Sequence, residues 1–252
     1  LFPWAKFRKT KGAIKLHDMI DLRGNIPAFL TITDGKVHDV KVAPLVPIEP
    51  EGIYVVDRGY VDFAWLWSVH QTRAFFVTRL KKSLNLTRVV SHPVDKSIGL
   101  RCDQEGLLSS LRLKNLYLNR LRRISFRDET QNSTLVFLTN NFTLPSETIA
   151  ILDKALWKIQ LFFKWIKQHL RIKAFYGTSE NAVKTQIWIA VSVYVLVAIL
   201  KKRLGLEPSL HQMLQVLSVT LFEKTPILRA FQHVDSKDPH HAISNQLILF
   251  DL

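Results

Sequence analysis

The sequence predicts an α/β protein with a β-rich stretch in its middle and a helical C-terminal part. Strand and helix patterns alternate up to residue 80, short strand-like pieces fill 81–143, and helical periodicity runs through 144–225. The chain has 252 residues, of which 47% are hydrophobic, so it can bury a sizeable core. We therefore expect four parts, at 1–80, 81–143, 144–225 and a tail at 226–252.

The first part begins with a predicted hairpin. Residues 14–22 and 28–33 read as strands, with a glycine-containing turn between them. Residues 53–56 are apolar at every position, which predicts a strand covered on both faces. A helix over 63–72 then leads to a strand at 74–78, and this strand-helix-strand order predicts a parallel pair.

Short strands and then long helices follow. Strands are predicted at 123–126 and 134–139, and the stretch that contains them reads as a β-rich insertion. Helices are predicted at 146–173, 179–203 and 208–222.

The longest apolar run, from Ile187 to Leu200, lies in the second of these helices. A membrane span needs about 20 apolar residues. This run ends at Lys201-Lys202-Arg203, so we expect a buried core helix and no membrane contact.

Charge and cysteine content narrow the class of protein. Lys and Arg outnumber Asp and Glu by 35 to 21, a formal charge of +14 that favours polyanionic partners. Cys102 is the single cysteine, which excludes an intrachain disulfide and fits a reducing, cytoplasmic location. The sequence starts at Leu1 without a secretion signal, and we expect an incomplete chain rather than a secreted one.

Asp57 is the first candidate site residue. It follows the apolar strand 53–56, where α/β sheets present catalytic groups, and it precedes Gly59. The same position suits an acid that only caps a turn. Position alone leaves both interpretations open.

The stretch 157–170 contains the second group of candidate site residues. Apolar residues recur along one helix face, at Ile159, Phe162, Phe163, Ile166 and Leu170. On the opposite face lie Gln160, Lys164, Lys167 and Arg171. This basic stripe is either an ordinary solvated helix face or a set of contacts to phosphates.

Three segments together resemble the DDE transposases of bacterial insertion sequences, in the insertion sequence four family. They are the motif Asp57-Arg-Gly-Tyr-x-x-Phe63, the hairpin around Lys15 to Pro27, and the helix from Leu161 to Lys173. The resemblance covers nearly the whole chain. It implies a ribonuclease H-like mixed sheet with flanking helices, in which two aspartates and a glutamate hold Mg²⁺ for phosphodiester cleavage and strand transfer.

The resemblance also exposes two departures from the family pattern. Asp57 matches the second acid, but the position of the glutamate is occupied by Gln160, and the first aspartate is expected upstream of Leu1. A neutral amide holds Mg²⁺ less well than a carboxylate. We therefore expect an inactive transposase domain, with a non-catalytic DNA-binding or transposase-binding inhibitor as the alternative.

Expected partners are DNA at transposon ends, a second copy in a synaptic complex and the replication sliding clamp, in a nucleoid-associated location. The candidate DNA contacts are Arg58, Tyr60, Arg122, Arg123, Lys164, Lys167 and Arg171. The candidate clamp-binding peptide contains Gln246, Leu247, Leu249 and Phe250. Packing of that peptide on the protein's own helices is the alternative.

Overall fold

The structure is a computed structural model that describes residues 3–8, 11–80, 84–128, 132–170, 175–220, 222–224 and 226–232. Their contacts divide the chain into two compact units. The first contains the described residues up to 164 together with 178–180, and the second contains those of 165–177 and from 181 onward.

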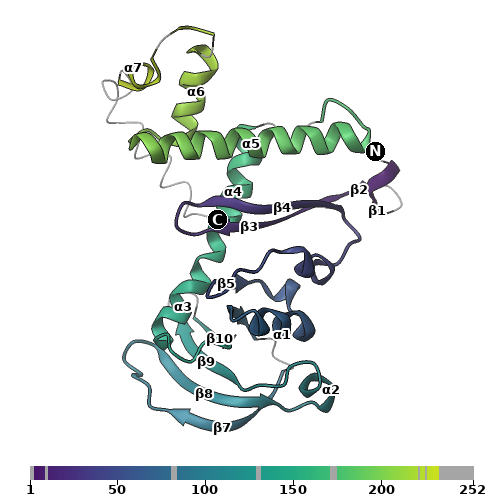
Figure 1. Cartoon of the computed structure of the whole chain (residues 1–252), viewed down its shortest axis with the longest axis vertical. Helices are drawn as coiled ribbons and strands as arrows, with labels where there is room; N and C mark the ends of the chain where they lie inside the picture. The colour runs from purple at the N-terminus through teal and green to yellow at the C-terminus, as the bar shows by residue number, and fades with distance from the viewer. Residues whose placement is uncertain are drawn as a thin grey trace. The chain divides into compact units, whose positions relative to one another are not determined.

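A six-stranded mixed sheet organises the first unit, in the order β5-β6-β10-β9-β8-β7 (Figure 1). The pair β5 and β6 is parallel, as the sequence predicts, and the other pairs are antiparallel. The strands that the sequence predicts as an insertion thus extend the same sheet, because β10 pairs directly with β6. The bounds are β5 Ile53–Val56, β6 Phe75–Arg79, β7 Leu86–His92, β8 Leu100–Leu108, β9 Leu121–Asp128 and β10 Ser133–Thr139.

Helices cover both faces of this sheet. One core contains Phe76 and Leu138 of the sheet with Leu66 of helix α1 (Phe63–Gln71). The other contains Val77 and Phe137 with Ile149 of helix α3 (Ser146–Lys154). Successive strand residues point to opposite faces, which explains why β6 is apolar at consecutive positions.

The predicted hairpin forms a separate two-stranded sheet, from β3 (Ile14–Asp21) and β4 (Ile26–Asp34). A second small pair precedes it, from β1 (Lys6–Arg8) and β2 (Lys11–Gly12). Within the described residues, β5 has a single strand neighbour, β6.

The prediction that β5 is covered on both faces is wrong. Ile53 is 42% exposed, and of the four residues only Val56 is buried. An outermost strand of a sheet lacks a neighbour on one side, so its side chains are covered less well than those of β6.

The predicted helix 146–173 is interrupted. It is divided at Ala155 into α3 and α4 (Leu156–His169). Two hydrogen bonds of the tighter i→i−3 type mark the break, from Ala155 N to Leu152 O and from Lys158 N to Ala155 O. The boundary between the two units lies within α4.

The second unit is helical, with α5 (Glu180–Leu204), α6 (Leu210–Thr220) and α7 (Ile227–Gln232). Val197, Met213 and Phe231 form the centre of its core. The short remaining elements belong to the first unit and are η1 Pro3–Ala5, η2 Asp39–Lys41, η3 Ala43–Leu45, η4 Arg58–Tyr60 and α2 Leu111–Lys114.

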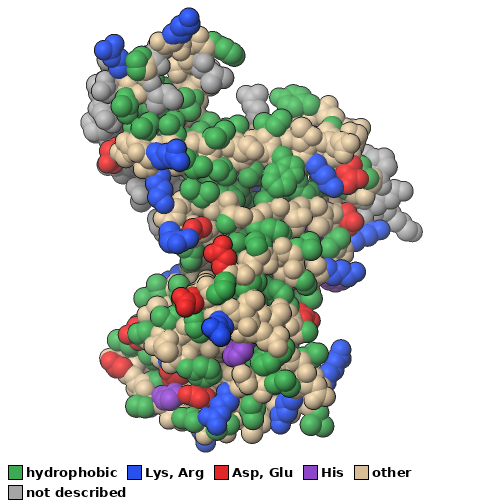
Figure 2. Space-filling model, viewed as in Figure 1, with side chains coloured by type: hydrophobic (Ala, Val, Ile, Leu, Met, Phe, Trp, Pro, Cys, Tyr) green, Lys and Arg blue, Asp and Glu red, His purple; other side chains and the backbone are tan. Residues whose placement is uncertain are grey.

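Helix α5 is buried on one side only. Its 18-residue apolar window has a mean hydropathy of 1.9 and is 33% buried. By length and composition it is the one described helix that could cross a membrane, which is weak evidence for a span. Hydrophobic side chains also lie on the surface over this helix (Figure 2). The expectation of a buried core helix therefore holds for one side of α5 and is wrong for its outer side.

Candidate functional site around Asp57

Asp57 lies directly after β5 and begins a tight turn. Its Oδ1 accepts a hydrogen bond from Gly59 N at 2.8 Å, so the carboxylate caps the short helix η4. The side chain is nevertheless exposed. A cap uses one carboxylate oxygen, and the other stays available to a ligand.

A second carboxylate lies beside this turn. A Cβ atom at Gly59 would lie 2.9 Å from Oδ2 of Asp39 and 3.5 Å from Oδ1 of Asp57. The missing side chain of Gly59 therefore lets both acids approach the same backbone segment. Lys15 Nζ lies 3.2 Å from Asp39 Oδ1 and partly balances this charge.

His17 connects the hairpin to the turn. Its Nδ1 lies 2.8 Å from the Tyr60 hydroxyl and its Nε2 lies 2.9 Å from Thr33 Oγ1, both within hydrogen-bond distance. The imidazole is 2% exposed, and burial lowers the pKa of His17, although Asp39 acts in the opposite direction. His17 is therefore a structural residue.

Tyr60, a candidate DNA contact, is half-buried, and its hydroxyl is engaged with His17. Burial raises the pKa of Tyr60, and the charges of Asp39, Asp18 and Asp57 raise it further. The phenol therefore stays neutral and serves to hold the turn. Arg58, in the same turn, is exposed.

An ion pair lies at the end of the neighbouring strand. Val56 of β5 is in register with Thr78 of β6, so Asp57 and Arg79 follow at adjacent strand ends. Arg79 forms a bidentate ion pair with Asp153 of α3, with Nη2 2.6 Å from Oδ2. The hydrogen bond to Asp153 raises the pKa of Arg79, and the charge of Asp57 acts in the same direction.

The partner of Arg79 is not readable from the sequence. The sequence favours a helix-start position for Asp153, where the helix dipole stabilises an acid, but the structure places Asp153 near the end of α3 with its side chain only 1% exposed. Pairing of Arg79 with Asp153 joins residues 74 positions apart. The available signals were a charged residue at the end of an apolar strand and an acid on the helix face that carries Ile149.

The predicted basic stripe on α4 is exposed. Gln160, Lys164 and Lys167 are accessible, while Phe162 is 3% and Ile166 0% exposed on the opposite side. Arg171 lies outside the described residues. Among the described residues no hydrogen bond joins Gln160 to Asp57.

The residues around Asp57 do not complete a metal site for Mg²⁺. Searched over the described residues, no group of three His, Cys, Asp or Glu side chains is placed to hold a metal ion. Asp57 and Asp39 supply two carboxylates, whereas a site for hard cations needs more oxygen ligands. No step through a metal follows from this arrangement.

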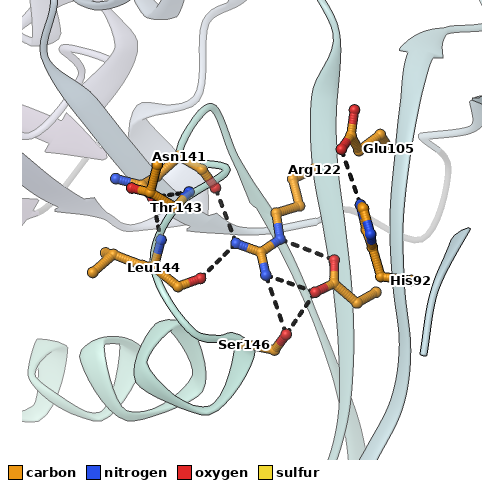
Figure 3. Close-up of polar contacts among 8 residues, drawn as sticks. His92, Glu105, Arg122, Asn141, Thr143, Leu144 and Ser146 are labelled. Carbon is orange, nitrogen blue, oxygen red and sulfur yellow. Dashed lines mark hydrogen bonds and ion pairs between the residues drawn. The ribbon is translucent and has the colours of Figure 1, made fainter. Parts of the chain in front are cut away.

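Arg122, another candidate DNA contact, is 7% exposed and bound inside the fold (Figure 3). Its guanidinium forms an ion pair with Asp103, with Nη2 2.6 Å from Oδ2, and Nη1 donates to the carbonyl of Leu144 at 2.6 Å. Ser146 donates to the same Asp103 oxygen. Burial alone would raise the pKa of Asp103, but the hydrogen bonds from Arg122 and Ser146 lower it.

This network fixes the start of α3 to the centre of the sheet, so Arg122 is engaged in structure and does not reach the surface. Arg123 points to the other face of β9, and it is partly exposed. Its Nε is buried and has no hydrogen-bond partner in the described part of the chain. The candidate clamp residues Gln246, Leu247, Leu249 and Phe250 lie outside the described residues.

The family model and the similar proteins agree on the class of protein to which this chain is similar. A family model described as "Transposase DDE domain" matches residues 3–196. "Putative transposase y4zB" of Sinorhizobium fredii is 31% identical over 242 residues, covering 94% of this chain and 67% of that protein.

Two further relatives are similar over shorter stretches. "Probable transposase for insertion sequence element IS5377" of Geobacillus stearothermophilus is 29% identical, over 77% of this chain and 51% of its own length. "Putative transposase for insertion sequence element IS4SA" of Synechocystis is 25% identical, over 74% and 53%. The chain thus spans between about half and two thirds of these relatives. No solved structure matches it.

Proposed function

Because the chain belongs to the transposase DDE domain family, we propose that it is a DNA transposase domain with a degenerate metal site, which binds DNA without cleaving it. The family predicted from the sequence is confirmed. One observation carries the rest: Asp57 stands at its strand end with Asp39 beside it, while the third acid of the family is replaced by Gln160.

The arrangement of the first unit supports a ribonuclease H-like order for this domain. A parallel strand pair is linked by a helix, an antiparallel hairpin lies in the same unit, and Asp57 follows the outermost strand of the sheet.

DNA cleavage by the family depends on oxygen ligands that hold Mg²⁺ and balance charge at the reacting phosphate. Glutamine supplies one carbonyl oxygen without charge. A lost direct ligand lowers activity by at least about 10 to 100-fold, the range seen for supporting residues of metal centres. We therefore propose that Asp57 remains part of the site but that the site does not catalyse DNA cleavage.

The test is Mg²⁺-dependent nicking of supercoiled plasmid that carries the insertion-sequence ends. The full chain should leave the plasmid supercoiled, because the amide of Gln160 carries no charge. The matched control is Asp57→Asn. Nicking by the full chain that disappears in Asp57→Asn would overturn the proposal, because it would show that the site turns over with glutamine at position 160.

A second function, a non-catalytic inhibitor, is favoured by the charge. The chain carries a formal charge of +14, and Lys164 and Lys167 are exposed on α4 with no paired acid among the described ion pairs. A chain that holds DNA or an intact transposase should lower transposition by that enzyme when both are present. Unchanged transposition would remove this function and leave the first proposal standing.

The clamp contact remains a separate proposal about residues 246–250. A peptide with a glutamine followed by Leu and Phe anchors can insert into a hydrophobic groove. Removal of residues 246–252 should abolish binding to immobilised sliding clamp. Equal binding of the shortened and full chains would exclude it.

A further inference from the structure

Helix α1 has a histidine in its last turn, His70, that contacts side chains from several segments. Its Nδ1 lies 3.0 Å from the hydroxyl oxygen of Tyr117 and 3.2 Å from Nδ2 of Asn140, and its Nε2 lies 3.0 Å from Nδ2 of Asn119. Trp67 stacks on the imidazole, with ring centroids 5.2 Å apart and 12° between the ring planes. These five residues are called the His70 cluster, and all of them lie in the first unit.

The backbone fixes the orientation of the Asn140 amide. Its Oδ1 accepts a hydrogen bond from Phe76 N at 2.8 Å, and its Nδ2 donates to the carbonyl oxygen of Ala74 at 2.9 Å. The opposite orientation would set two donors against each other at Phe76 and two acceptors at Ala74. Asn140 is 5% exposed, so the loss of these bonds would leave buried polar groups unpaired. The group of Asn140 that faces His70 is therefore a donor, Nδ2.

This donor decides which nitrogen of His70 carries the proton. Nδ1 can accept a hydrogen bond only when it is unprotonated, so the neutral ring has its proton on Nε2. Nε2 faces Asn119, which is exposed and can turn its amide oxygen toward the ring. Burial raises the pKa of Tyr117, so its hydroxyl keeps its proton and also donates to Nδ1.

The segments that meet at the cluster provide no acid that could balance a second proton on His70. Residues 63–76, 110–120 and 137–142 contain no Asp or Glu. Their charged residues are the cations Arg73, Arg112, Lys114 and Arg120. The turn before β5 reaches the same strand ends, with Glu51 N bonded to the carbonyl oxygen of Arg73 at 3.0 Å, but the side chain of Glu51 is exposed. Burial is accordingly what lowers the pKa of His70.

We propose that His70 is a pH-sensitive switch, which joins the end of α1 to the start of β6 and the end of β10 when it is neutral and separates from them when it is protonated. The second proton goes to Nδ1, because Nε2 already carries one. Nδ1–H then meets Nδ2 of Asn140 as donor against donor. The Tyr117 hydroxyl can turn to accept, whereas Asn140 can turn only by giving up its bonds to Phe76 and Ala74. The inference does not depend on DNA binding or cleavage.

Acid should weaken this part of the sheet, and neutral pH should restore it. A folded-state pKa of His70 below the ordinary value of 6.5 means that the unfolded chain binds the proton more readily. The stability that neutral His70 provides is therefore complete above about pH 6.5, and it is lost as pH falls toward the lower pKa of the folded protein. The first bond to weaken should be the one from Phe76 N to Asn140.

Nitrogen NMR of the full chain labelled with ¹⁵N-histidine tests the protonation state. The His70 signals, assigned from their loss in His70→Asn, should show an unprotonated Nδ1 and a protonated Nε2 at pH 8. They should titrate below pH 6.5. A proton on Nδ1 at pH 8, or a titration midpoint at or above 6.5, would overturn the proposal.

Hydrogen exchange tests the consequence for the sheet. In the parent, the Phe76 amide should lose protection between pH 8 and pH 5, after correction for the intrinsic pH dependence of exchange. In His70→Asn this protection should change little, because the amide oxygen replaces Nδ1 and accepts at both pH values. His38→Asn, at an exposed histidine outside the cluster, is the matched control and should behave like the parent. Equal protection of Phe76 at both pH values in the parent, or the same loss in His70→Asn, would overturn the proposal.

Discussion

Asp18 on β3 provides a sharp test of the electrostatics near the candidate site. Its Oδ2 is buried and has no hydrogen-bond partner among the described residues, and burial raises the pKa of Asp18 to about 7. The perturbation is Asp18→Asn, which keeps the shape and removes the charge. Since the folded protein penalises the carboxylate, ionisation of Asp18 destabilises the fold.

The sign and size follow from linkage. A pKa that is higher in the folded than in the unfolded chain means that stability falls as pH rises between the two values. The interval from 3.8 to about 7 corresponds to about 4 kcal/mol at 1.36 kcal/mol per tenfold change in proton affinity. Part of this cost is already present at pH 5. Between pH 5 and pH 8 the parent should lose about 2.5 kcal/mol relative to Asp18→Asn.

Urea unfolding of both proteins at pH 5 and pH 8 measures this difference, and other titrating groups cancel between the two. Asp34→Asn is the matched control on the paired strand, because its Oδ1 accepts a bond from Lys36 N that an amide oxygen can also accept. The control measures the effect of an Asp→Asn change on the same hairpin where the side chain has a backbone hydrogen-bond donor. A parent-minus-variant difference for Asp18→Asn that is equal at both pH values would refute the reasoning.

Two further predictions concern Arg122 and the α4 stripe. Arg122→Met leaves Asp103 buried without its cation and should lower the free energy of unfolding by about 3–5 kcal/mol, measured by urea unfolding. The double variant Arg122→Met, Asp103→Leu should lose less free energy of unfolding than Arg122→Met alone. If the losses of the two single substitutions simply added in the double variant, the ion pair would be contradicted. Lys164→Gln with Lys167→Gln should weaken duplex binding and reduce the salt slope by about 2, whereas Lys41→Gln, exposed outside α4, serves as the reference for a single surface charge. An unchanged slope would leave these two lysines without a role in binding.

Local patterns in the sequence predicted most elements of the fold. The strand at 53–56 is found with the predicted bounds, and the helix at 63–72 is shorter by one residue. The parallel pairing of β5 and β6 was also predicted, because a strand-helix-strand order strongly favours it. In these cases each residue's environment follows from its near neighbours.

Pairing between distant strands was not predictable in this way. The sequence marks short strands at 123–126 and 134–139 as an insertion, but β10 hydrogen-bonds to β6 and so continues the main sheet. Whether a strand is outermost in its sheet also depends on which strands pair with it. The burial of β5 was therefore predicted wrongly. In contrast, Phe76 and Val77 of the neighbouring β6 are completely buried.

The candidate site shows the same division. By itself the sequence determined the family, the charge of the chain, the acid at position 57 and the glutamine at position 160, because these depend on residue identity and spacing. The tertiary structure decided that Asp39 lies beside Gly59, that Arg79 pairs with Asp153 and that Arg122 is buried. Each of these contacts joins residues from separate elements. The sequence alone leaves open whether a charged side chain contacts solvent, DNA or a buried partner. Tertiary packing decides this, because it brings one partner within hydrogen-bond distance.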